Sequence, residues 1–99
     1  MTINQSDYYT FINEGVEIML DVLLDGDRAV IDVRERIKNG EHPRFEILEY
    51  IKQSPDGMVF EIHLPKRGQP LVEGLEDMGL KAVVDEVEEG HYRIITAKV

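Results

Sequence analysis

The chain has 99 residues, of which 42% are hydrophobic and 31% are charged, a balance typical of one globular domain rather than of a disordered segment. It contains no cysteine, which excludes disulfides, thiolate metal ligands and any covalent sulfur intermediate. Its formal net charge of -9 repels nucleic-acid phosphates, so we expect no nucleic-acid partner.

The same sequence gives no reason to expect a membrane protein. No apolar run approaches the roughly 20 residues that a membrane-spanning helix needs. The first residues, MTINQSDYY, lack the basic start and the apolar stretch of a secretory signal. We therefore expect a cytoplasmic protein with no membrane partner.

Residues 7–24 are predicted to form an amphipathic helix, with Ser6 or Asp7 as N-cap and Asp25-Gly26 as its end. The apolar residues lie close to the i, i+3, i+4, i+7 spacing, and the stripe is wide. A wide stripe is either buried on two sides or contacts a second copy, giving a possible homodimer through residues 8–24; ordinary core packing is the simpler reading. We accordingly divide the chain into an N-terminal helical extension, 1–27, and a domain, 28–99.

The domain begins with a predicted strand, AVIDVR at 29–34, whose residues alternate between two faces. After a polar loop, Pro43 suits the first turn of a helix, with His42 in the capping position. Its predicted buried stripe contains Phe45, Ile47, Leu48 and Ile51.

The second half of the domain repeats this pattern. Residues 58–64 alternate as a strand, Pro70 begins a helix that stops at Gly79, and two strands follow around Glu88-Glu89-Gly90 as a hairpin. Strands that are separated by helices should run parallel, whereas the hairpin adds an antiparallel strand. We predict an α+β two-layer sandwich of order β-α-β-α-β-β, with a four-stranded mixed sheet and the extra N-terminal helix.

The segments IDVRE, GEHPRFEIL, GMVFEIHLPKRGQPLVEGL and EEGHYRI occur in an order that resembles the TusA-like (SirA-like) superfamily, and most closely its cysteine-free branch. The resemblance covers residues 29–97 and implies the same β-α-β-α-β-β order. The sulfur carriers of that superfamily begin the first helix of this unit with Cys-Pro, and here the pair is His42-Pro43. Without a thiol the chain cannot carry a persulfide.

Ligands of open α/β sheets gather beyond the carboxyl ends of the parallel strands, where helices begin. That edge is predicted to bind a small anion or an acidic segment of a partner protein, through helix N-termini and nearby cations. The candidate residues are Arg34, Glu41, His42, Pro43, Arg44, His63, Lys66 and Arg67. The alternative is that these basic residues occupy loops only because loops are solvated.

A second hypothesis concerns the three histidines. The arrangement of the family brings His91 to the same edge, where His42, His63 and His91 could bind a divalent metal. We predict no other cofactor, and no catalytic motif is present. The sequence favours a non-enzymatic binding or interaction module over a small metal- or anion-dependent enzyme. The resemblance implies that such a module would be accessory to redox or sulfur-related proteins.

Overall fold

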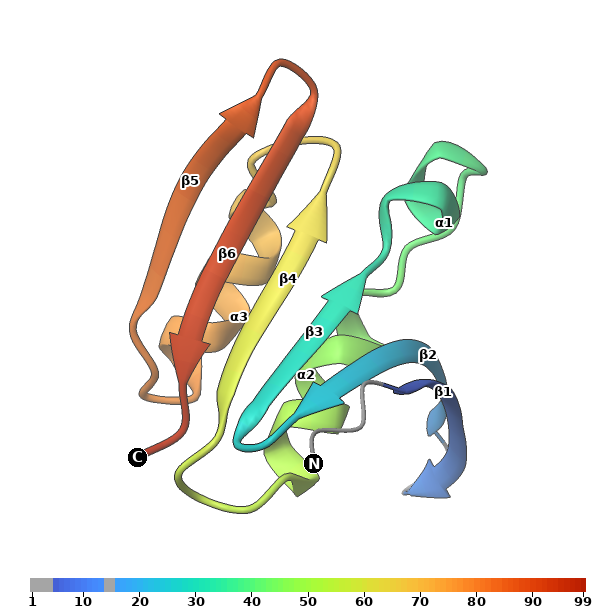
Figure 1. The fold of residues 1–99 in the computed structure, drawn as a ribbon, viewed down its shortest axis with the longest axis vertical. Coiled ribbons are helices and arrows are strands. Elements are labelled where there is room, and N and C mark those ends of the chain that lie inside the picture. The colour runs from blue at the N-terminus through green and yellow to red at the C-terminus, as the bar shows by residue number, and fades with distance from the viewer. Residues whose placement is uncertain (1–4, 14–15) are drawn as a thin grey trace.

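The computed structural model describes residues 5–13 and 16–99, with side chains described from Leu20 onward. Six strands form one mixed sheet in the order β1-β2-β3-β4-β6-β5 (Figure 1). The strands are β1 (Gln5–Asn13), β2 (Val16–Asp25), β3 (Arg28–Asp32), β4 (Val59–Leu64), β5 (Ala82–Glu88) and β6 (His91–Ala97). The helices are α1 (Arg34–Lys38), α2 (Arg44–Gln53) and α3 (Gln69–Asp77). The predicted α+β class is confirmed.

The predicted N-terminal helix is wrong, because β1 and β2 form an antiparallel pair and β2 continues the sheet beside β3. Leu20 and Val22 are fully buried while the intervening Asp21 is only half-buried, which is the two-residue period of a strand. A run of apolar residues on both faces fits a helix and a strand equally well, so periodicity could not separate them. The sheet therefore has two strands more than predicted.

The predicted boundary at residue 27 lies in the turn between β2 and β3, which pair with each other and share one core. The predicted dimer surface, residues 8–24, falls on β1 and β2. The side chains of residues 8–19 lie outside the described ones, so that surface stays a prediction.

The rest of the strand order agrees with the prediction. β3 and β4 run parallel, with Asp32 beside His63, and β6 runs antiparallel to β4, with Arg93 beside His63. The β5 and β6 strands form the predicted terminal hairpin. The short helix α1 was not predicted: it follows β3 directly, where the sequence indicated a polar loop.

Helices α2 and α3 lie on the same face of the sheet, behind it in Figure 1. Ile47 and Ile51 of α2 and Leu75 of α3 are buried against the central strands. Phe45, which was predicted to be buried, is 63% exposed. Each helical residue turns by about 100°, so Phe45 is about 200° from Ile47 and faces away from the sheet. No described helix is long and apolar enough to span a membrane.

Candidate functional site

The structure divides the predicted site residues between two places. Five of them line a cleft of about 510 Å³ between the loop before α2 and the beginning of α3: Glu41, His42, Pro43, Arg44 and Lys66. Arg34, His63 and Arg67 are not among the residues that line it. The predicted common edge is therefore not one site: five of its residues line a cleft on the helical side, whereas His63 lies on the other face of the sheet and Arg34 and Arg67 have local partners.

The floor of the cleft is apolar. It is formed by Ile37, Ile47, Leu64 and Leu71, which come from α1, α2, β4 and α3. Gly68 lies directly before α3 with a φ of 68°, a left-handed conformation that favours glycine. A Cβ atom there would lie 2.5 Å from Leu64 Cδ1, so glycine keeps this part of the floor open.

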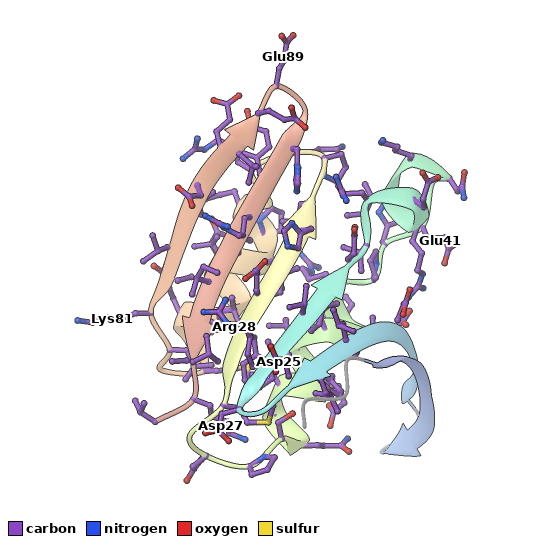
Figure 2. The ribbon with its side chains drawn as sticks, in the orientation of Figure 1. Asp25, Asp27, Arg28, Glu41, Lys81 and Glu89 are labelled. Carbon is purple, nitrogen blue, oxygen red and sulfur yellow. The ribbon has the colours of Figure 1, made fainter. Side chains whose placement is uncertain are left out.

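Arg36 holds the loop that carries His42. Its guanidinium donates two hydrogen bonds to Glu46 in the first turn of α2, at 2.7 and 2.8 Å, and a third to Glu41 at 2.8 Å. The hydrogen bond to Glu46 is the main reason that the pKa of Arg36 is raised above its ordinary value. Figure 2 shows Glu41 on the loop between α1 and α2. One guanidinium thus engages two carboxylates, and among the residues that line the cleft the cations Arg44 and Lys66 outnumber the single carboxylate, Glu41.

The rim of the cleft carries cations and one aromatic ring. Lys66 and Arg44 are exposed, and neither forms an ion pair with a described side chain. The Arg44 guanidinium instead lies 4.5 Å from the centroid of the Phe45 ring. Phe45 is the one exposed aromatic residue among residues 20–99. Sequence reasoning missed it as a site residue, although its spacing from Ile47 carried the signal.

A second hollow of about 540 Å³ runs between α2 and α3. It shares Arg44, Phe45 and Pro70 with the cleft, so Phe45 stands between two adjoining hollows. Its walls include Leu48 and Gly74, where the two helices approach each other closely. We call this hollow the α2–α3 groove; it was not predicted from the sequence.

His63 lies on the open face of the sheet, opposite to the helices. Its Nε2 is 2.7 Å from Glu61 Oε2 and its Nδ1 is 2.8 Å from His91 Nε2. Partial burial alone would raise the pKa of Glu61. The interactions with His63 and, to a smaller extent, with Arg28 outweigh burial, so the pKa of Glu61 is lowered. Partial burial and the positive charge of Arg34 lower the pKa of His91.

The other two predicted residues pair locally. Arg34 donates to both carboxylate oxygens of Asp32, at 3.0 and 2.7 Å. Burial opposes ionisation of Asp32, yet these bonds lower its pKa on balance. The Arg67 guanidinium lies 5.8 Å from the centroid of the Tyr92 ring. Both arginines therefore already have partners outside the cleft.

The three histidines of the predicted metal site do not come together. His63 and His91 are neighbours on the open face, whereas His42 is exposed at the cleft. Among the described residues, no group of three or more His, Cys, Asp or Glu side chains could hold a metal ion. The expected three-histidine set is therefore not formed in this structure.

No protein-family model, curated protein or solved structure matches this chain in comparisons of sequence and fold. The resemblance to the TusA-like superfamily therefore depends on the short motifs around His42-Pro43 and on the order of strands and helices. It stays a prediction.

Proposed function

We propose that this protein is a binding module whose cleft takes a ligand with an apolar body and an anionic end group. The observation that carries the proposal is the exposed Phe45 ring at the rim of an apolar cleft, beside the unpaired cations Arg44 and Lys66. Binding pockets typically combine an apolar lining with a few polar groups that fix the orientation of the ligand.

The start of α2 adds to the preference for an anion. Its N-cap is Pro43, and no side chain caps the free N-H groups of its first turn. The positive end of the helix dipole favours negative charge there. The anionic group of the ligand is expected near the first turn of α2, with the apolar part on Ile47 and Leu71.

The module binds rather than turns over its ligand in this proposal. The cleft is lined by one histidine, His42, and by one carboxylate, Glu41, which Arg36 already engages. His63 and His91 line neither the cleft nor the α2–α3 groove. The resemblance to the TusA-like superfamily supports a cytoplasmic accessory role beside redox or sulfur-related proteins, without the persulfide step.

Three small probes test the cleft: octanoate, 1-octanol and acetate, each titrated against the amide spectrum of nitrogen-15-labelled protein. Octanoate should produce saturable shifts at residues 42, 44 and 66, with affinity about 10- to 150-fold above octanol, since a charged hydrogen bond contributes about 1.5–3 kcal/mol. Acetate should produce none at the same concentration. Replacing Lys66 by Gln should bring the octanoate affinity down toward that of octanol. Octanoate shifts that are absent, or unchanged in that variant, would contradict the proposal.

A further inference from the structure

The cleft and the α2–α3 groove are continuous with each other. Arg44, Phe45 and Pro70 belong to the lining of both, and the hollows measure about 510 and 540 Å³. One pocket for a small ligand usually has a volume of about 300–1,000 Å³. Each hollow alone reaches that size, so the pair offers two adjoining apolar subsites separated by one exposed ring.

The two ends of this surface carry opposite charge. The cleft end presents Lys66 and Arg44. The groove end presents Glu73 and Asp77 on α3, which form no ion pair with any described side chain. Glu49 and Lys52 also line the groove, and the Glu49 carboxylate accepts a hydrogen bond from Gln53. Glu73 also accepts a long hydrogen bond, 3.5 Å, from Gln69. The groove is thus lined by three carboxylates and two cations, with both α3 charges negative, whereas the cleft is lined by two cations and one carboxylate.

We infer that the occupant of this surface is a single segment of a partner protein, acidic at one end and basic at the other, with an apolar side chain on each side of Phe45. The inference rests on the proposed function of the cleft and names its partner. A small anion in the cleft would meet neither Glu73 nor Asp77, because these two line only the groove. A segment that crosses Phe45 places acidic residues beside Lys66 and basic residues beside Glu73.

Phe45 has the properties of a residue on which such an interface depends. It is an exposed aromatic side chain on a helix, held by the Arg44 stack, and it lies centrally between the two hollows. Aromatic residues at the centre of an interface usually contribute most of the binding energy, while charges at the rim set orientation and specificity. The charge gradient therefore predicts which partner segments are accepted.

Two synthetic peptides test the inference. Both carry two leucines four positions apart after two glutamates; one ends in two lysines, and the other ends in two further glutamates. The wild-type protein should bind the mixed peptide about tenfold more tightly than the acidic one at low salt, because like charges across an interface repel. The double variant Glu73→Lys with Asp77→Lys should prefer the acidic peptide instead. Phe45→Ala should weaken both peptides by tenfold or more.

The outcomes separate this inference from the proposed function. Equal binding of the two peptides, with amide shifts confined to residues 42, 44 and 66, would overturn the inference of a partner segment. The proposed function of the cleft would still stand. Absence of peptide binding while octanoate still shifts the same residues has the same meaning. A solution mass that rises with concentration and falls in Phe45→Ala assigns the surface to a second copy of this chain, which also overturns the inference. If octanoate fails as well, both proposals are contradicted.

Discussion

His63 Nδ1 lies 2.8 Å from His91 Nε2 although 28 residues separate them in the sequence. The antiparallel register of β4 and β6, which sets Arg93 beside His63, brings the first residue of β6 close to the end of β4. Glu61 extends the contact, so carboxylate, imidazole and imidazole form one hydrogen-bonded chain across the open face. Because this face carries no helix in the described part of the chain, the network is a polar surface feature rather than a core element.

Glu61 should make the stability of the fold depend on pH in acid. Its folded-state pKa is below the ordinary 4.5, so the folded protein binds fewer protons than the unfolded chain as the pH falls. The stabilisation is complete above about pH 4.5 and is lost as the pH drops through the lowered pKa. Glu61→Gln should remove about 1 kcal/mol of unfolding free energy at pH 7 and flatten the loss between about pH 5 and 3. Urea unfolding across that range measures both effects; Glu76→Gln, on the exposed side of α3, is the control. Parallel pH profiles for Glu61→Gln and wild type would contradict the assignment.

Arg36 should control both stability and the shape of the cleft. Arg36→Gln leaves the Glu46 carboxylate, only 19% exposed, without its main partner. We expect a loss of about 1–2 kcal/mol in unfolding free energy, the usual cost of an unpaired, partly buried charge. Octanoate affinity should fall several-fold, because the loop carrying His42 loses its anchor. The matched control is Arg34→Gln, whose pair with Asp32 is exposed on both sides and should contribute no more than about 1 kcal/mol. Equal effects of the two variants would refute the anchoring role.

Lys98 should stabilise the end of α2 from the other terminus of the domain. Its Nζ donates to the carbonyl oxygens of Ile51, Lys52 and Ser54 at 3.1, 2.7 and 2.5 Å. These carbonyls lie at the negative end of the helix, where a cation is favourable. Lys98→Met should therefore cost about 1–2 kcal/mol by chemical denaturation. Lys81→Met, at an exposed position, should change stability by less than about 0.5 kcal/mol. An effect of Lys98→Met no larger than that of Lys81→Met would show that the hydrogen bonds of Lys98 do not contribute to stability.

Gly68 and Gly90 separate the cost of backbone conformation from the cost of a close contact. Both have positive φ, at 68° and 77°, but a Cβ atom would meet Leu64 and Ile94 only at Gly68. Gly90→Ala should lose about 1 kcal/mol from the left-handed backbone alone. Gly68→Ala should lose a further 1–3 kcal/mol, roughly the cost of overpacking, and it should narrow the cleft. Thermal and urea unfolding of both variants give the difference; a difference near zero would mean that Leu64 moves aside without cost.

The domain after residue 28 was predictable because its local signals agree with each other. Strict alternation at 58–64 marked β4, whose even-numbered residues are buried, and prolines and glycines placed α2, α3 and the final hairpin within a residue or two. Where the local signal was ambiguous, the prediction failed. The apolar stretch of residues 16–24 satisfied the spacing of a helix, and only pairing with β3 made it a strand.

The candidate site, like the fold, was predictable only in part. Residue types and their places at helix starts identified Glu41, His42, Pro43, Arg44 and Lys66, all of which line the cleft. The grouping of His63 with them failed, because side chains alternate along a strand: Leu64 points toward the cleft, so its neighbour His63 points to the open face. Phe45 was misplaced because the start and phase of a helix must be known to within one residue before its faces can be assigned.

The sequence by itself determined the class of fold in this protein, the positions of most strands and helices from residue 28 onward, and the exclusion of thiol chemistry, since these follow from composition and from signals that act over a few residues. Only the tertiary structure decided that the N-terminal segment completes the sheet, that Phe45 is exposed between two hollows, and that His63 meets His91 and not His42. Those outcomes depend on pairing between distant segments, and the free energy of such pairing is not contained in any short stretch of the chain.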